Sequence, residues 1–236
     1  MSKITNLDQH KERVVVGNIL KSWRDDPVKF VKDNFGITPD PWQVDFLQAF
    51  TTHKRLAGIA SKGVGKTTVL AWCILNFIST RPHPKIACTS ISFDNLSDGL
   101  RSEIAFWLGK SPFLQRLFKL TKTRLFNEQN SETWFCSFRS WSKSADSNAQ
   151  ALTLAGLHAD YMLFICDEAG SYPDAIIATA EGALSSGIES KLVLMGNPTD
   201  INGPLFKVAN TKERNNWYVQ HINADPDSPN RSVRVS

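Results

Sequence analysis

The sequence is poor in cysteine, the residue from which disulfide frameworks and zinc clusters are built. It has four cysteines in 236 residues, widely spaced and without a Cys-x-x-Cys pair. This spacing excludes a disulfide-rich secreted fold and a zinc ribbon, and it favours reduced thiols in the core of an intracellular protein. The four residues are Cys73, Cys88, Cys136 and Cys166.

Long hydrophobic runs, internal repeats and low-complexity tracts are also missing. The longest apolar run, 69–78, is interrupted by Asn76. It is shorter than the roughly 20 residues of a membrane-spanning helix. No signal peptide opens the chain, so we expect no membrane partner.

Charge of either sign is not in large excess. The chain has 27 Lys and Arg against 23 Asp and Glu, a formal net charge of +4, and 42% of its residues are hydrophobic. This balance is ordinary for a globular protein, and it permits a nucleic-acid partner without requiring one. The length suits one large domain or two small ones.

A glycine loop between two apolar segments is the most informative stretch that is present. It reads Ala60-Ser-Lys-Gly-Val-Gly-Lys-Thr67, after an apolar run at 56–59 and before another at 69–78. This order predicts a strand, a phosphate-binding loop and a helix. The common pattern begins with Gly where this chain has Ala60, and a chance glycine turn before a helix is the alternative.

The loop residues suit the phosphates of a nucleotide. Glycines at 63 and 65 let the backbone amides of about 63–67 approach an anion at a helix N-terminus. Lys66 would reach the β- and γ-phosphates, and the Thr67 hydroxyl would ligate Mg²⁺. We therefore predict that ATP and Mg²⁺ bind at this loop.

Two adjacent carboxylates supply the second half of the expected site. They end the run Tyr161-Met-Leu-Phe-Ile-Cys-Asp167-Glu168, which predicts a central strand of a parallel sheet covered by helices. Because chemistry gathers at the carboxyl ends of such strands, Asp167 would hold Mg²⁺ and Glu168 would activate the attacking water. Acidic residues also end strands as plain turn residues, which is the alternative.

A third strand is expected at 191–195, and it ends in Gly196-Asn-Pro-Thr199. Asn197 is a candidate sensor of the γ-phosphate or of the attacking water, because its amide can both donate and accept hydrogen bonds. A proline-containing turn without such a role explains the same spacing.

The first 50 residues predict a helical lead-in. Asp26-Pro27 and Asp40-Pro41 are typical helix starts, and Gly36 is expected to end the first of these two helices. Gln43 lies in the first turn of the second. Its carboxamide can pair with the donor and acceptor edge of adenine, or it is a solvated surface residue.

A basic stretch separates the two halves of the expected site. Residues 110–127 carry five Lys or Arg and no acidic residue, with phenylalanines interleaved. This composition is typical of a contact with a nucleic-acid backbone, and equally of a solvated helix face. A hairpin is expected over 125–138 and a polar loop over 140–150.

The motifs together resemble the ATPase domain of the large terminase subunit, the motor that packages DNA into the heads of tailed bacteriophages and related viruses. The motifs occur in the family's order and cover about residues 26–222. The resemblance implies an α/β fold, a mostly parallel, helix-covered P-loop sheet of the additional-strand type. One strand is then inserted between the phosphate-loop strand and the Asp-Glu strand. The carrying stretches are Asp40-Pro-Trp-Gln43, Gly63-Val-Gly-Lys-Thr67, Gly156-Leu-His-Ala-Asp-Tyr-Met-Leu-Phe-Ile-Cys-Asp-Glu-Ala169 and Gly196-Asn-Pro-Thr199.

By this resemblance, Gln43 reads adenine and 197–199 couples hydrolysis to movement. The family often has a basic residue early in the phosphate loop, proposed to sense nucleotide, and Lys62 stands there. Lys62, Lys66 and Glu168 are the implied catalytic residues. The implied nucleotide-binding set is Gln43, Ser61, Lys62, Gly63, Val64, Gly65, Lys66, Thr67, Thr68 and Asn197, with Thr67 and Asp167 holding the metal.

An additional cation on the γ-phosphate is expected from a neighbouring subunit, because ring motors often receive an arginine finger in trans. Arg139 is the first candidate, since it ends the predicted hairpin and is expected to be exposed before a polar loop. Arg101 and Arg124 are the next candidates. An ordinary surface charge is the alternative explanation of Arg139.

The implied function is Mg²⁺-dependent ATP hydrolysis that drives double-stranded DNA into a procapsid. The implied partners are DNA, the portal protein, the small terminase subunit and further copies in a ring. The implied location is the host cytoplasm, transiently at the procapsid portal, and not the mature virion. The alternatives are a helicase-like DNA translocase and a nucleotide-gated DNA-binding module with little turnover.

We expect one ATPase domain over 1–222 and a linker over 223–236. The family's complete subunit carries a nuclease domain after the ATPase, and the tail of this chain looks like a linker toward such a domain. Nuclease activity is therefore not expected of this chain.

Overall fold

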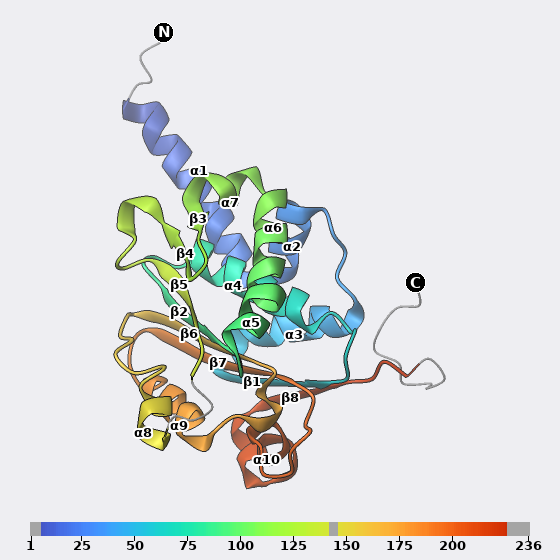
Figure 1. Ribbon diagram of the computed structural model, residues 1–236. Helices are drawn as coiled ribbons and strands as arrows, with labels where there is room; N and C mark the ends of the chain where they lie inside the picture. The colour runs from blue at the N-terminus through green and yellow to red at the C-terminus, as the bar shows by residue number, and fades with distance from the viewer. Residues whose placement is uncertain (1–5, 142–145, 226–236) are drawn as a thin grey trace.

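A single sheet of eight strands forms the centre of the computed structural model, which describes residues 6–141 and 146–225 (Figure 1). The strands are β1 (Arg55–Ala60), β2 (Lys85–Thr89), β3 (Phe118–Leu120), β4 (Arg124–Asn127), β5 (Phe135–Arg139), β6 (Tyr161–Asp167), β7 (Glu189–Gly196) and β8 (Tyr218–Ile222). Their order across the sheet is β3-β4-β5-β2-β6-β7-β1-β8. The pairs from β5 to β8 are parallel, and only β3–β4 and β4–β5 are antiparallel.

The inserted strand expected from the resemblance is β7. It pairs in parallel with β1, which precedes the glycine loop, and with β6, which ends in Asp167. The mostly parallel sheet of the additional-strand P-loop type is thereby confirmed.

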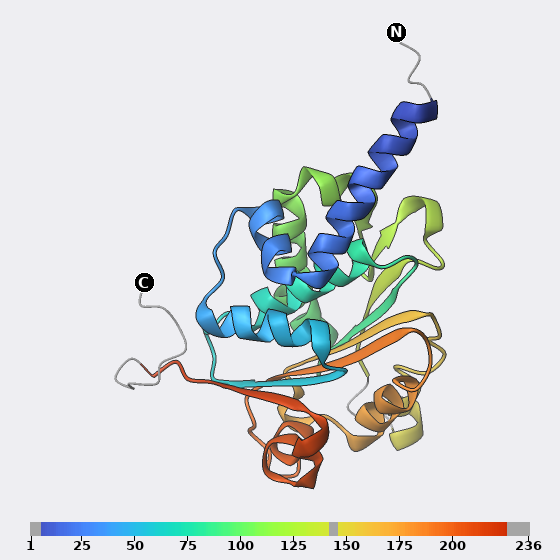
Figure 2. The same ribbon diagram turned by 180° about the vertical axis from the view of Figure 1, so that it is seen from behind.

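Helices cover both faces of the sheet (Figures 1 and 2). One face carries α1 (Asn6–Asp25), α2 (Pro27–Phe35), α3 (Pro41–Thr52), α4 (Lys66–Thr80) and α6 (Ser102–Lys110). The other face carries α8 (Ser147–Ala151), α9 (Asp174–Ala183) and α10 (Pro204–Asn210). Alternate residues of each strand therefore enter different cores: Ile86 and Cys88 of β2 pack on the α4 side, and Ala87 packs on the α9 side.

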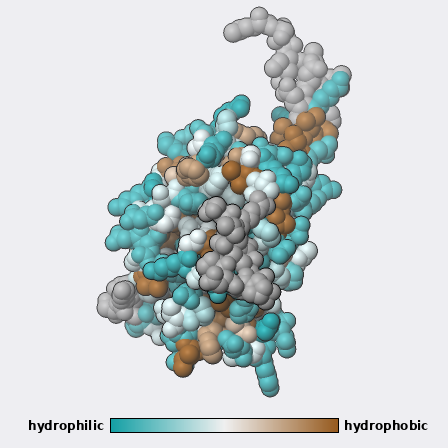
Figure 3. Space-filling model, turned by 90° about the vertical axis from the view of Figure 1, so that its right-hand side faces the viewer, coloured by the Kyte–Doolittle hydropathy of each residue, from teal (hydrophilic) through white to brown (hydrophobic). Residues whose placement is uncertain are grey.

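Three helices, α1, α2 and α3, lie within the described part of the expected lead-in, and local chemistry explains their boundaries. The Asp26 side chain accepts a hydrogen bond from the Lys29 N–H ahead of Pro27, which starts α2. Gly36 ends α2 with φ +67°, a left-handed conformation that glycine adopts without steric cost. The outer part of α1 projects from the body and carries exposed apolar side chains at 14–16 (Figures 1 and 3).

Two local expectations differ from the structure. The predicted hairpin is present as β4 and β5, but a third strand, β3, extends it. Part of the expected loop over 140–150 is helical, because the Asp146 carboxylate accepts from the Ala149 N–H at 2.8 Å and caps α8. Residues 142–145 of that loop, and 226–236 of the predicted linker, lie outside the described residues.

The four cysteines are buried and free, as expected. Within the part of the chain that the structure describes, no helix is both long and apolar enough to cross a membrane.

Candidate active site

The carboxyl ends of three strands converge on one cavity. β1 leads into the glycine loop, β6 ends in Asp167, and β7 ends in Gly196. The cavity has a volume of about 210 Å³, and residues from all three sequence motifs line it. The lining residues are Lys62, Lys66, Ile91, Glu168, Gly170, Ser171, Gly196, Asn197 and Thr199.

The glycine loop has the backbone that an anion cradle requires. Gly63 has φ +81° and Gly65 has φ +86°, both in the region that glycine favours. Gly65 is the N-cap of α4, so the loop amides and the positive end of a 15-residue helix lie together. A Cβ at Gly65 would lie 3.0 Å from Gln43 Nε2, so a larger residue at this position would also crowd the Gln43 side chain.

Lys66 lies back on its own loop. Its Nζ donates to the Ala60 carbonyl oxygen at 3.4 Å and also to the Ser61 carbonyl oxygen. Burial lowers the pKa of the Lys66 ammonium, and the charges of Asp167 and Glu168 oppose this shift. A phosphate group would replace these carbonyl contacts with a charged acceptor.

Asp167 is a buried carboxylate, 7% exposed. Burial, and then the neighbouring Glu168 charge, raise the pKa of Asp167 to about 6. An anion held in so little water suits a divalent cation, so the residues fit Mg²⁺. Within the described residues no group of three or more His, Cys, Asp or Glu forms another metal site. Asp167 and, as the sequence predicts, the Thr67 hydroxyl are the residues that would hold the ion.

Glu168 has an uncommon backbone for a residue with a side chain, with φ +55° and ψ +40°. Such conformations cluster at functional sites, where the surroundings hold them. Here the Glu168 N–H donates to Asp167 Oδ1 at 3.0 Å, and the Tyr172 hydroxyl donates to the Asp167 carbonyl oxygen at 2.8 Å. Gly196 adds to this support, because a Cβ there would lie 3.2 Å from the Glu168 carbonyl carbon.

The Glu168 side chain has a partner that the sequence did not indicate. Asn95 Nδ2 donates to Glu168 Oε2 at 2.5 Å. Asn95 ends the short helix α5 (Phe93–Asn95), where the Ser92 hydroxyl accepts from its N–H, and a π-helical segment η1 (Leu96–Arg101) follows. The two residues are 73 positions apart, so no local spacing predicts the contact.

Asn197 is exposed at the rim of the cavity, and its backbone is packed against the turn after Glu168. A Cβ at Gly170 would clash with the Asn197 carbonyl oxygen, and a Cβ at Gly203 would clash with the Gly170 carbonyl oxygen. Only glycine permits this approach, which joins the loop after β7 to the end of β6.

The remaining predicted nucleotide-binding residues differ in burial and in their hydrogen-bond partners. Gln43 is 7% exposed, and its Oε1 accepts from the Asp40 N–H at 2.9 Å. The Thr68 hydroxyl donates to Glu103 Oε1 at 2.7 Å, which leaves only its amide for a phosphate. Ser61 is exposed, and its carbonyl oxygen accepts from Lys66. Val64 is buried and presents only its backbone.

Comparisons with known proteins agree with this geometry. No protein-family model matches the chain. A probable large terminase subunit of Enterobacteria phage P7 is 27% identical over 177 residues, 73% of this chain and 35% of that protein. The large terminase ATPase domain of Thermus phage P74-26 superposes with a TM-score of 0.63 at 14% identity, over 84% of this chain and 86% of that one. The chain has the fold of a phage large terminase ATPase domain.

Longer terminases share the fold over part of their length. The large terminase of bacteriophage HK97 has a TM-score of 0.63 at 16% identity, over 87% of this chain and 45% of that one. The large terminase of a thermophilic bacteriophage, solved in complex with ADP, has a TM-score of 0.58 at 15% identity, over 79% and 46%. This chain spans about a third (35%) of the length of its curated relative.

In this terminase fold the predicted arginine finger is not exposed. Arg139 ends β5, its Nε donates to Ser137 Oγ at 3.0 Å, and its Nη1 donates to the Thr153 carbonyl oxygen at 2.9 Å. Burial chiefly lowers the pKa of its guanidinium. It does not line the cavity. The expectation of an exposed side chain is therefore wrong, and a role as a finger stays a prediction.

The other two candidate arginines are also engaged. Arg101 Nε donates to the Thr121 carbonyl oxygen at 2.8 Å. Arg124 lies 4.1 Å from the centre of the Phe135 ring, and its Nη1 lies 3.7 Å from Glu132. Lys119 also pairs with Glu128 at 3.1 Å. Glu128 and Glu132 thus partly offset the positive charge of the basic stretch 110–127. These exposed pairs are weak and screened by salt.

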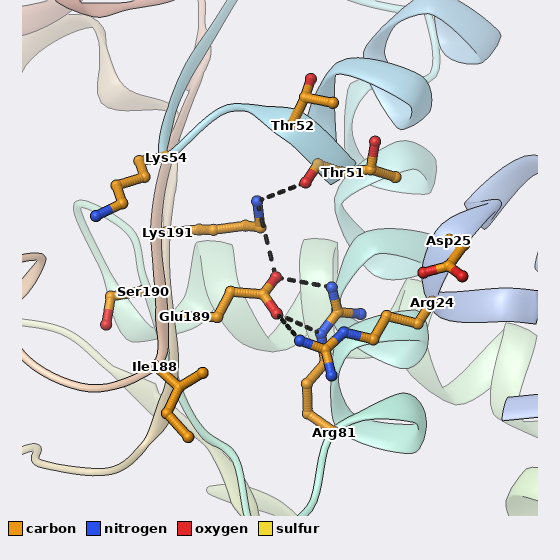
Figure 4. Close-up of a pocket in the computed structure, with 10 residues that line it drawn as sticks. All are labelled: Arg24, Asp25, Thr51, Thr52, Lys54, Arg81, Ile188, Glu189, Ser190 and Lys191. Carbon is orange, nitrogen blue, oxygen red and sulfur yellow. Dashed lines mark hydrogen bonds and ion pairs between the residues drawn. The ribbon is translucent and has the colours of Figure 1, made fainter. Parts of the chain in front are cut away.

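A larger cavity of about 460 Å³ lies at the opposite edge of the terminase sheet, where β7 begins (Figure 4). Glu189 accepts there from Arg24 at 2.9 Å and from Arg81 at 2.8 Å, and Lys191 lies 3.7 Å from it. Lys191 also donates to the His53 carbonyl oxygen at 2.9 Å. Because these cations converge on one carboxylate, the cluster ties α1, α4 and β7 together.

Proposed function

We propose that the chain is the ATP-hydrolysing motor domain of a viral terminase large subunit, which moves double-stranded DNA into a procapsid. The observation that carries this proposal is the cavity lined by Lys66, Glu168 and Asn197, where three distant motifs meet. The similarity of the chain to large terminase subunits of phages supports the same function.

The site residues divide the chemistry of phosphoryl transfer. The loop amides and Lys66 bind the β- and γ-phosphates, and Lys62 adds a charge at the rim. Mg²⁺ held by Thr67 and Asp167 would neutralise charge on the phosphates. Glu168 orients the attacking water and accepts its proton. Gln43 reads the base, and Asn197 responds to the γ-phosphate.

The partners follow from the packaging role. They are double-stranded DNA, the portal protein, the small terminase subunit and neighbouring copies in a ring. The domain would act in the host cytoplasm and at the procapsid portal, and would be absent from the mature virion. We place the DNA contact on the basic stretch 110–127, and a trans cation at Arg139.

Steady-state phosphate release tests the proposal. Wild type should hydrolyse ATP with Mg²⁺, and Lys66→Ala should lose both turnover and ATP affinity. Glu168→Gln should bind ATP but lose turnover by about 100-fold or more, because the amide keeps the shape and lacks the basicity. Turnover by Glu168→Gln within a few-fold of wild type would remove Glu168 as the base.

Two further assays separate the alternatives. Strand displacement on a forked duplex would favour a helicase-like translocase. Saturable ATP binding without any release of phosphate, in the presence of DNA and of a portal, would favour a nucleotide-gated binding module.

A further inference from the structure

A buried hydroxyl beside the metal residues has no partner. Ser90 is 1% exposed, and among the described residues nothing accepts from or donates to its Oγ. A buried polar atom without a hydrogen bond is destabilising, so native proteins rarely leave one without a ligand or water. Ser90 therefore indicates a polar species that belongs at this position.

The sheet register places Ser90 next to Asp167. β2 and β6 are parallel, and Thr89, the last residue of β2, pairs with Cys166. Ser90 follows Thr89 directly, as Asp167, the last residue of β6, follows Cys166. Ile91, one residue further, lines the active-site cavity. Ser90 thus lies at the carboxyl edge of the sheet, where the catalytic motifs meet.

Ser90 and Asp167 also share one face of the sheet. Ile86 and Cys88 of β2, and Leu163 and Ile165 of β6, pack in the core that contains α4. Side chains alternate along a strand, so Ser90 and Asp167 continue these two rows toward the same side. α4, which begins at Lys66, packs on that side of the sheet.

We propose that the Ser90 hydroxyl binds a water molecule in the shell of the Mg²⁺ held by Asp167 and Thr67. This inference rests on the proposed function, because it assumes a metal–nucleotide site. Mg²⁺ keeps several of its waters in proteins, and these waters need polar partners. The orphaned hydroxyl on the strand beside Asp167 supplies such a partner, which makes Ser90 a positioning residue for the metal.

A hydroxyl that serves the metal site differs from a purely structural hydroxyl in its effect on the stability of the ligand-free protein. A structural hydroxyl would stabilise the fold, and its removal would lower the melting temperature. An orphaned one contributes nothing without its ligand, so Ser90→Ala should leave the ligand-free melting temperature unchanged or slightly raised. Its cost should appear only when metal is present.

The experiment measures Mn²⁺ affinity by electron paramagnetic resonance, with the full chain saturated with ADP. Outer partners of metal ligands typically contribute 10–100-fold to affinity, so Ser90→Ala should weaken Mn²⁺ binding by about 10-fold. Ser90→Thr keeps a hydroxyl and should recover most of the loss. Ser190→Ala is the matched control, because Ser190 is a buried serine that donates to the Ser186 carbonyl oxygen at the far edge of the sheet.

Each outcome has one meaning. Weaker Mn²⁺ binding by Ser90→Ala, with an unchanged ligand-free melting temperature and a normal Ser190→Ala control, supports the inference. Equal Mn²⁺ affinity in Ser90→Ala and wild type overturns it, and so does a lower ligand-free melting temperature without loss of affinity. Failure of wild type to bind Mn²⁺ with ADP would instead overturn the proposed ATPase site.

Discussion

In the candidate active site, contacts position both the backbone and the side chain of Glu168. Glu168 has a left-handed backbone conformation, and its N–H donates to Asp167 Oδ1. The Tyr172 hydroxyl donates to the Asp167 carbonyl oxygen, and Gly196 packs close to the Glu168 backbone. The carboxylate that should accept the proton is itself held by Asn95. Under the proposed function, we therefore expect turnover to depend also on residues that do not touch the nucleotide.

Replacement of Asn95 by Ala should lower kcat for ATP hydrolysis by about 10-fold and leave the ATP KM nearly unchanged, because only the aim of the base is lost. Phosphate-release kinetics check this split. Asn210→Ala is the control, since Asn210 is an exposed helical residue whose amide donates to the Phe206 carbonyl oxygen. An unchanged kcat in Asn95→Ala would show that the contact with Glu168 does not aim the base.

Asp167 should make the ligand-free protein less stable as pH rises. Its pKa is about 6 in the folded protein against an ordinary value of 3.8, so the folded state binds more protons between these values. The free energy of unfolding then falls as pH rises from about 4 to about 6, by on the order of 2–3 kcal/mol. Asp167→Asn should lack this fall and lose metal binding. The free energy of unfolding is measured by denaturant melts of both proteins across this pH range. The same change with pH in wild type and Asp167→Asn would show that Asp167 does not cause the fall.

At the scale of elements, Gly170 and Gly203 allow the segment after β6 and the loop after β7 to pack closely against each other. Gly170→Ala would place a methyl group against the Asn197 carbonyl oxygen, so the loop after β7 must move. We expect a lower melting temperature and at least about 10-fold slower hydrolysis. Gly182→Ala, a helical glycine with nothing within 4 Å of its added Cβ, should be neutral or stabilising. Normal hydrolysis by Gly170→Ala would mean that the contact is not needed.

The Glu189 cluster ties three elements together at the opposite edge of the sheet. Glu189→Gln would leave Arg81 and Lys191, each 3% exposed, without their carboxylate. Breaking a buried ion pair from one side costs about 3–5 kcal/mol, so the melting temperature should fall clearly. Glu128→Gln, which removes the exposed pair with Lys119, should cost less than about 1 kcal/mol. Equal losses in the two variants would contradict a buried cluster.

Elements with strong local signals were predictable from the sequence, and the others were not. β1, β6 and β7 are continuous apolar runs that end in motif residues, so both their type and their role were evident. β8 is a partly exposed edge strand with Gln220 and His221 among its apolar residues, and it has no motif to mark it. The Asn95–Glu168 contact and the burial of Arg139 arise from tertiary packing, which spacing along the chain cannot show.

At the scale of the whole molecule, the rim of the cavity is exposed and would be accessible to a neighbouring copy in the proposed ring. Lys62 and Asn197 are exposed around the cavity, and none of the described arginines is among its lining residues. Phosphoryl transfer in ring motors gains from a cation that another subunit supplies. Under the proposed function, the ring rather than the single domain would be the complete enzyme.

A mixing experiment tests whether Arg139 is that cation. Arg139→Ala and Glu168→Gln should each be inactive in the assembled motor, and mixed rings should recover phosphate release where an intact Arg139 lies beside an intact Glu168. For this to happen, Arg139 must leave Ser137 and the Thr153 carbonyl oxygen on assembly. A monomeric domain should accordingly be a poor ATPase whose activity per subunit rises with concentration. Full activity of Arg139→Ala in the assembled motor would exclude it, and the same test would then pass to Arg101 and Arg124.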